Sequence, residues 1–421
     1  RAMRTGSLAP ERLGLGGAGE VAQGWLAATR DGVSGMFSRL EGMNNIKVAN
    51  FPNLQIGWAA KRDPPPEWHD RSTVEYITPE RKRELKMGAD ELHHVPIPGA
   101  GWANALWRYR PAGRGRSQGA VMLLPGCASN SRCFDLAEDV SLARYLASQG
   151  FDVFVVEERG VGASKRLSNL DRPKGVVPET PSWDFDSYLY EDVPVAMEHI
   201  ALVTGEREIL GVGHSMGGMI LSVMAGLQGR AEEERGGADP GAVRLCGVVI
   251  AGSCLECSDG KGHASSYGES AKWTAMTLAP QVSAPSSLPV PHLPLRGISV
   301  AEAAIIGRLL GPVRMSDPAS RRELLRESIV GSTSARGAIP QPLLRRLLVT
   351  GFDDIPFELL LQLTTLFEPG GLASRGGTMR YMDIMAEVRV PFLAIAGDVD
   401  RMFSPNAVAA TAAAVPGGEY M

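Results

Sequence analysis

The sequence has no long apolar run, and this absence excludes the simplest class of membrane protein. No stretch of about 18 consecutive apolar residues occurs in the 421-residue chain, so we expect no transmembrane segment. A basic excess is also missing, because 43 Lys and Arg stand against 47 Asp and Glu. Without a basic face we expect no nucleic-acid partner. The 44% hydrophobic content indicates a globular protein with a large core.

Cysteine is scarce, and the five cysteines are Cys127, Cys133, Cys246, Cys254 and Cys257. Their odd number and irregular spacing favour reduced thiols in an intracellular protein. Cys254 and Cys257 make one C-x-x-C pair, but no second cysteine pair and no nearby histidine pair accompany it. We therefore expect no zinc site, and we predict no other metal and no cofactor.

The alternation of strands and helices begins at residue 91. We expect strands at 91–98, 103–109, 120–124, 151–156, 208–212, 246–251 and 390–396. We expect helices at 141–148, 184–204, 216–227 and 405–415. The order predicts an α/β protein with a mostly parallel central sheet and helices on both faces.

The remaining segments interrupt or precede this alternation. Helical patterns at 301–310, 321–330, 343–349 and 357–367 are interpreted as an inserted helical cap. We therefore divide the chain into an N-terminal extension and linker (1–88, partly disordered), a first core part (89–252), the cap (253–386) and a second core part (387–421). Within the extension, a helix is predicted at 20–40 and a stiff proline-rich linker at 63–67. The chain begins at Arg1 rather than methionine, so we interpret it as a fragment or a processed form.

One pentapeptide carries the strongest chemical signal. Gly213-His214-Ser215-Met216-Gly217 follows an apolar strand and opens a helix, which is the context that a nucleophile elbow requires. Gly213 and Gly217 leave room for the sharp turn, and Gly218 lets the helix pack close to the sheet. Ser215 is therefore the predicted nucleophile.

A nucleophilic serine needs donors for its oxyanion. The N–H of Met216 is one candidate, since it follows the nucleophile. The loop 125–130 follows the strand at 120–124, and Cys127 in this loop is the candidate for the second N–H. The catalytic acid is expected after a later strand, where Asp398 and Asp400 are available. We favour Asp400, and we interpret Asp398 as a turn residue.

The general base is the missing part of the pattern. The chain has seven histidines, and none follows Asp400. We expect the base on the loop after a strand that starts near residue 419, and so beyond Met421. The chain as given is then expected to be nearly inactive. His263 and His292 in the cap are alternatives, whereas His214 is expected to point the wrong way for a base.

These motifs together resemble the α/β-hydrolases of the esterase, lipase and acyltransferase type. The matching residues are Leu124-Pro125-Gly126, Glu158-Arg159-Gly160-x-Gly162-x-Ser164, the elbow through Gly218, and Gly397-x-x-Asp400. Over residues 89–421 the chain is similar to uncharacterised plant and algal α/β-hydrolases, which implies a location in plastid or cytoplasm. A fainter similarity to bacterial polyester synthases lies in Cys127-Ala-Ser-Asn130; those proteins use a cysteine where this chain has Ser215.

The predicted function is hydrolysis of a carboxylic ester or other acyl compound through an acyl-enzyme. An acyltransferase would use the same residues, and a chain that truly lacks the histidine would be a non-catalytic binding protein. The leucines of the cap favour a small acyl or lipid-like substrate, although the same leucines are equally explained as the core of the cap. The cap is also a candidate for peripheral membrane contact.

Overall fold

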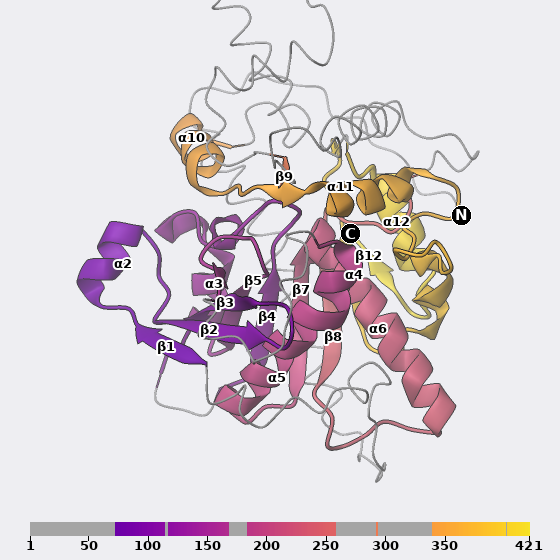
Figure 1. The fold of residues 1–421 in the computed structure, drawn as a ribbon, viewed down its shortest axis with the longest axis horizontal. Coiled ribbons are helices and arrows are strands. Elements are labelled where there is room, and N and C mark those ends of the chain that lie inside the picture. The colour runs from indigo at the N-terminus through magenta and orange to yellow at the C-terminus, as the bar shows by residue number, and fades with distance from the viewer. Residues whose placement is uncertain (1–71, 114–116, 168–182, 258–291, 294–338, 401) are drawn as a thin grey trace, which may run out of the picture.

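The computed structural model describes residues 72–113, 117–167, 183–257, 292–293, 339–400 and 402–421. The helices expected at 20–40, 301–310 and 321–330 and the linker at 63–67 lie outside these residues. Within the described residues, one mostly parallel sheet forms the centre of the molecule, with helices packed against it (Figure 1).

The described strands of the main sheet follow the order β1-β2-β3-β5-β4-β7-β8-β11-β12, with β6 added beside β3. Their bounds are β1 Thr73–Tyr76, β2 Glu91–Ile97, β3 Trp102–Tyr109, β4 Ala120–Leu124, β5 Asp152–Glu157, β6 Lys165–Arg166, β7 Glu208–His214, β8 Arg244–Ala251, β11 Phe392–Ile395 and β12 Glu419–Tyr420. Pairing is antiparallel from β1 to β5 and parallel from β5 through β4 to β12. This arrangement confirms the predicted α/β class.

The central strands are buried on both faces because helices cover each side. Every residue of β4 and β5 is buried, as the continuous apolar runs predicted. The α-helices of the described residues are α2 Pro79–Leu85, α3 Leu142–Ser148, α4 Phe185–Ser187, α5 Val193–Thr204, α6 Met216–Arg235, α10 Gln341–Thr350, α11 Phe357–Thr364 and α12 Pro405–Ala413. Two apolar clusters, one on each side of the sheet, form the core.

The helix expected at 184–204 is confirmed as a continuous helical segment from Phe185 to Thr204, although its hydrogen bonding is not α-helical throughout. Asp184 caps the short α4 through a capping box with Ser187, and a π-helical turn at Tyr188–Asp192 follows before α5 begins. Pro194 has no N–H to donate, so the regular bonding cannot continue across it. The wider turn also brings the Asp192 carboxylate to Arg159, whose Nε donates to it at 2.8 Å.

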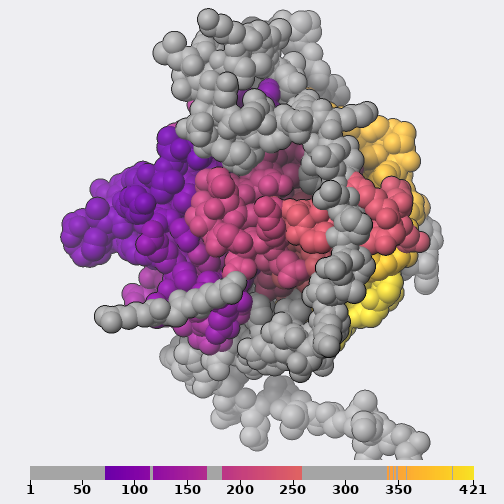
Figure 2. Space-filling view, turned by 90° about the horizontal axis from the view of Figure 1, so that it is seen from below, coloured from indigo at the N-terminus to yellow at the C-terminus, as the bar shows by residue number. Residues whose placement is uncertain are grey.

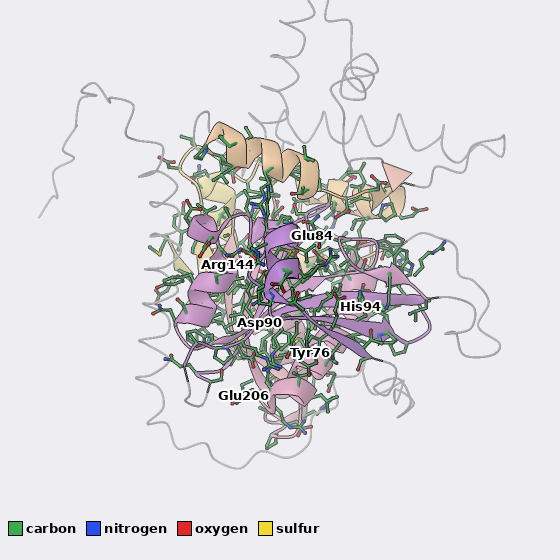
Figure 3. The ribbon with its side chains drawn as sticks, turned by 90° about the vertical axis from the view of Figure 1, so that its left-hand side faces the viewer. Tyr76, Glu84, Asp90, His94, Arg144 and Glu206 are labelled. Carbon is green, nitrogen blue, oxygen red and sulfur yellow. The ribbon has the colours of Figure 1, made fainter. Side chains whose placement is uncertain are left out.

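The sheet begins upstream of residue 89, the expected start of the core. β1 pairs with β2, and α2 follows β1 with Thr78 as its N-cap. Figure 3 faces this flank of the molecule and labels Tyr76 of β1, Glu84 of α2 and His94 of β2. Seen from below, the first described residues (indigo, from residue 72) occupy one flank and the C-terminal residues (yellow) the opposite one, as the strand order requires (Figure 2).

Three elements that come between β8 and β11 in the chain lie over the carboxyl ends of the parallel strands. They are α10, α11 and the strand β9 (His292–Leu293), which pairs with β10 (Ile355–Pro356). Figure 1 shows α10, β9 and α11 along the upper side of the molecule, where the parallel strands end. Among the described residues, no helix is both long and apolar enough to cross a bilayer.

Candidate active site

Ser215 occupies a sharp turn between β7 and α6. Its backbone has φ 51° and ψ −120°, which residues other than glycine rarely adopt. The Ser215 N–H donates to the Ala251 carbonyl at 3.0 Å, and the Ser215 carbonyl accepts from the Ser253 hydroxyl at 2.7 Å. Strain of about 1–3 kcal/mol at one residue persists only where its surroundings fix it. The turn expected at Ser215 is therefore present, and the serine is half-buried.

Three glycines make this turn sterically possible. A Cβ at Gly213 would overlap the Gly217 backbone, and a Cβ at Gly217 would overlap the Leu124 carbonyl. At Gly218 a Cβ would lie 2.7 Å from the Ser253 side chain. The elbow thus packs directly on β4 and on the segment after β8, and no larger residue fits these three positions without displacing backbone or Ser253.

The loop after β4 passes directly beside the serine. A Cβ at Gly126 would lie 3.0 Å from the Ser215 Cβ. Cys127, the next residue in the chain, therefore also lies close to the elbow. The Met216 and Cys127 N–H groups donate to no described residue. Met216 also opens α6, whose N-terminus favours negative charge. Both expected oxyanion donors therefore lie at the elbow with their amides unused by the described part of the chain.

A residue that the sequence did not reveal holds this loop. Asp353, between α10 and β10, accepts through Oδ2 from the Asn130 side chain and from the Gly162 N–H, both at 2.9 Å. The Asp353 N–H donates to the Ala128 carbonyl at 2.7 Å. Ala128 has φ 60°, an uncommon conformation for alanine, and this bond helps to fix it. No motif around Asp353 could have predicted the contact.

Asp400 is oriented by its own loop. Its Oδ1 accepts from the N–H groups of Met402 and Phe403 at 2.8 and 2.9 Å. Its Oδ2 would lie 3.5 Å from a Cβ built on Gly252, the residue that follows β8. Asp398 is exposed on the same loop. Of the two aspartates, Asp400 is thus the one whose carboxylate points toward the elbow.

His214 lies between the elbow and this acid. Its Nδ1 is 3.6 Å from the Cys133 sulfur, and its Nε2 would lie 3.9 Å from a Cβ on Gly252, close to the Asp400 carboxylate. Burial lowers the pKa of His214 below its usual range, although the Asp400 charge acts in the opposite direction. At neutral pH the imidazole is therefore uncharged.

The other histidines are placed as follows. His93 and His199 contact each other at 3.0 Å inside the β2–α5 interface, and His94 contacts the Ala163 carbonyl. His292 lies in β9, and His69 and His263 lie outside the described residues. The strand expected near residue 419 is present as β12, and its ladder continues through Met421, whose N–H donates to Ala394. A residue that follows β12 would emerge at the edge that carries Ser215 and Asp400.

Two thiols near the elbow are poor nucleophiles. Burial raises the pKa of Cys127 to about 12, with the nearby Glu158 carboxyl adding to it. Burial also raises the pKa of Cys133 to about 12. The thiolate is the reactive form of cysteine, so neither sulfur competes with the Ser215 hydroxyl at neutral pH.

Glu158 and Arg159, which directly follow β5, differ in their surroundings. Arg159 pairs with Glu191 and Asp192, both within 2.7 Å. Glu158 is buried, and its Oε1 has no hydrogen-bond partner among the described residues. Burial raises the pKa of Glu158 to about 8, with the Asp192 and Glu157 charges adding to it. The described residues contain no group of three or more acidic, histidine or cysteine side chains able to hold a metal ion.

Comparison with known sequences identifies related proteins. The chain is 32% identical over 129 residues to Lipase lipl-3 of Caenorhabditis elegans and 31% identical over 144 residues to Lipase 1 of Drosophila melanogaster. It is 27% identical over 130 residues to a poly(3-hydroxyalkanoate) polymerase of Methylorubrum extorquens. These matches cover 30%, 33% and 31% of this chain, but only 29%, 30% and 19% of those proteins.

Comparison with solved structures finds the enol-lactonase of Burkholderia xenovorans LB400, with a TM-score of 0.42 and 14% identity over 77% of this chain and 90% of that one. A thioesterase domain from the curacin biosynthetic pathway gives a TM-score of 0.42 and 15% identity over 78% and 92%. The family model "Serine aminopeptidase, S33" matches residues 115–329, which is half of the chain and includes the Ser215 elbow. The chain therefore belongs to the serine aminopeptidase S33 family of serine hydrolases and has the α/β-hydrolase fold.

Proposed function

We propose that the protein hydrolyses a carboxylic ester or another small acyl compound through an acyl-enzyme on Ser215. The observation that carries this proposal is the strained Ser215 backbone, at φ 51°, held between the Ala251 and Ser253 contacts. A fold holds such strain where a side chain must project from a fixed point. Two of the curated relatives are called lipases, which supports an ester rather than another acyl substrate.

The described residues suggest a role for each group in the reaction. The Ser215 hydroxyl attacks the acyl carbon, and the Cys127 and Met216 N–H groups stabilise the oxyanion. Asp400 orients the base, because its Oδ2 is directed toward the elbow while its Oδ1 is held by two N–H groups. Water then cleaves the acyl-enzyme. An alcohol in the place of water would make the protein an acyltransferase.

We further propose that the base is a histidine carried by a loop at the carboxyl ends of the parallel strands, within reach of Asp400. Parallel strands end at the same edge of a sheet, so a loop after β12 reaches the edge of Ser215 and Asp400. A serine hydroxyl needs a neighbour to accept its proton, so replacing this histidine is expected to cost about as much kcat as replacing Ser215. His214→Gln tests the imidazole beside Asp400 in the same way, and a loss as large as that of Ser215→Ala would contradict the proposed position of the base.

The experiment uses the full-length protein with a panel of short- and long-chain esters. Wild type is expected to release the acid, and Ser215→Ala to lose several orders of magnitude in kcat. Adding an alcohol acceptor separates hydrolysis from acyl transfer, because only a transferase makes the new ester in preference to the acid. Ser222→Ala is the matched control: the hydroxyl of this buried serine donates within α6, to the Gly218 carbonyl at 2.8 Å, and this is its one bond to a described residue. Equal activity in wild type and Ser215→Ala would contradict the proposal.

A further inference from the structure

Cys254 and Cys257 lie together in the turn that follows β8. Their sulfur atoms are 3.0 Å apart, and the two side chains are buried, at 0% and 6% exposure. We propose that this pair is a redox modification site, at which hydrogen peroxide converts the two thiols into an intrachain disulfide. The site lies outside the proposed catalytic residues, and disulfide formation does not depend on the proposed function.

The backbone around the pair holds the two sulfurs face to face. The Leu255 N–H donates to the Thr411 hydroxyl at 3.1 Å, and the Leu255 carbonyl accepts from Leu372 at 2.8 Å. The Cys257 N–H donates to the Leu366 carbonyl at 2.9 Å. A disulfide has a sulfur–sulfur length of about 2.0 Å. Closing the bond therefore needs an approach of roughly 1 Å between the two sulfurs.

The surroundings favour a thiol pair over a metal site. No third potential ligand joins the two sulfurs among the described residues. Burial raises the pKa of Cys254 well above its usual range, so Cys254 reacts poorly as the first nucleophile. Cys257 is the more exposed sulfur and is expected to meet the oxidant first. A small oxidant such as peroxide suits a pair that is almost closed to solvent.

The chemistry balances in two steps. The Cys257 thiolate attacks one oxygen of hydrogen peroxide, the O–O bond breaks, hydroxide leaves, and Cys257 becomes a sulfenic acid. The Cys254 sulfur then attacks the Cys257 sulfur, the S–O bond breaks, and the leaving hydroxide takes a proton to become water. In total, two thiols and one peroxide give one disulfide and two waters. Excess dithiol reverses the reaction by exchange.

The pair also touches the loop of the proposed acid. The Cys257 sulfur is 3.8 Å from the Met402 carbonyl, and the Met402 N–H donates to Asp400 at 2.8 Å. Oxidation removes the Cys257 S–H donor and draws the sulfur toward Cys254. We therefore expect the disulfide to loosen the Asp400 loop and lower kcat reversibly. This consequence, unlike the disulfide itself, rests on the proposed function.

Peptide mapping of the full-length protein tests the disulfide directly. After peroxide treatment, the protein is denatured, alkylated with iodoacetamide and digested with trypsin. Cleavage after Arg244 and Lys261 gives a peptide that contains Cys246, Cys254 and Cys257. We expect three alkyl groups before oxidation, one after it, and three again after dithiothreitol. Cys246→Ser is the matched control and should still lose two alkyl groups.

The opposite results are equally defined. Three alkyl groups retained after peroxide, or stable sulfinic acid on Cys257 without loss of the Cys254 thiol, would overturn the proposal. So would a disulfide that disappears in Cys246→Ser. Ester hydrolysis is measured in parallel, with Cys257→Ser as the variant that peroxide should not inhibit. If the disulfide forms but kcat is unchanged, only the link to Asp400 is refuted. If the protein has no esterase activity, the proposed function is contradicted, but the disulfide proposal is not, because the peptide map detects the disulfide independently of activity.

Discussion

Asp353 holds Asn130 at 2.9 Å, across 223 residues of sequence. This contact ties the segment between α10 and β10 to the loop that carries Cys127, and the same carboxylate oxygen accepts from Gly162. The position of the proposed oxyanion donor therefore depends on a residue between β8 and β11.

The first prediction concerns this contact. Asp353→Ala removes the acceptor of the Gly162 N–H and one of the two acceptors of the Asn130 amide, which keeps the Thr350 carbonyl, at a cost of about 1–3 kcal/mol in stability. The loosened loop should also lower kcat, by about tenfold or more, because small displacements at an oxyanion hole are costly. Asp353→Asn keeps an oxygen acceptor and should recover much of kcat. Thermal unfolding and ester kinetics measure the two effects.

The exposed acid Asp383 serves as the control for this series. Asp383→Ala should change neither the melting temperature nor kcat. If Asp353→Ala and Asp383→Ala behave alike, the contact does not position the loop.

The second prediction concerns the steric demand at the elbow. Gly217→Ala places a methyl group on the Leu124 carbonyl, so β4 or α6 must shift. We expect a loss of about 1–3 kcal/mol in stability, typical of overpacking, together with a large loss of activity. Gly376→Ala is the matched control, since its nearest neighbour would be 3.8 Å away. Urea unfolding that shows equal stability for both variants would contradict the packing described here.

The third prediction separates two neighbouring aspartates. Asp400→Asn removes the charge that faces the elbow while its volume stays the same, and kcat should fall by about 10⁴ if it orients the base. Asp398→Asn, on the exposed side of the same loop, should leave kcat unchanged. The comparison is made on the full-length protein at saturating ester. Equal losses in the two variants would mean that the loop, rather than the Asp400 charge, is what matters.

The fourth prediction follows from the buried Glu158. The folded protein keeps the Glu158 proton up to a pKa of about 8, whereas the ordinary value is 4.5. The unfolded state therefore binds fewer protons between these values, and stability falls as pH rises through that window. Glu158→Gln removes this pH dependence. The free energy of unfolding of the variant, relative to that of the wild type, should therefore rise by a few kcal/mol from pH 5 to pH 8, because each unit of pKa shift is worth about 1.4 kcal/mol.

Urea unfolding at the two pH values measures the difference. Glu138→Gln is the control, because the Glu138 side chain is 92% exposed. A relative stability of Glu158→Gln that does not change with pH would show that Glu158 ionises as an ordinary carboxyl.

Local pattern predicted most of the central fold. The sequence predicted the apolar strands β4, β5 and β7 and the glycines of the elbow. Each of these features is determined by residues that are adjacent in the sequence. The π-helical turn before Pro194 and the added strand β1 were not predicted, because each depends on a partner: Asp192 on Arg159, and Thr73–Tyr76 on β2. Asp353 is the extreme case, since its role lies entirely in contacts distant in sequence. The similarity to plant and algal proteins and the location in the cell stay predictions.

The most direct test of the central claim is the site of reaction with a fluorophosphonate, which modifies activated serines. The full-length protein is labelled, digested and mapped by mass spectrometry, beside Ser215→Ala and the Ser222→Ala control. We predict one adduct, on the peptide that contains Ser215, present in wild type and Ser222→Ala and absent from Ser215→Ala. An adduct that persists in Ser215→Ala, or that maps to another serine in the wild type, would contradict the assignment of Ser215 as the nucleophile.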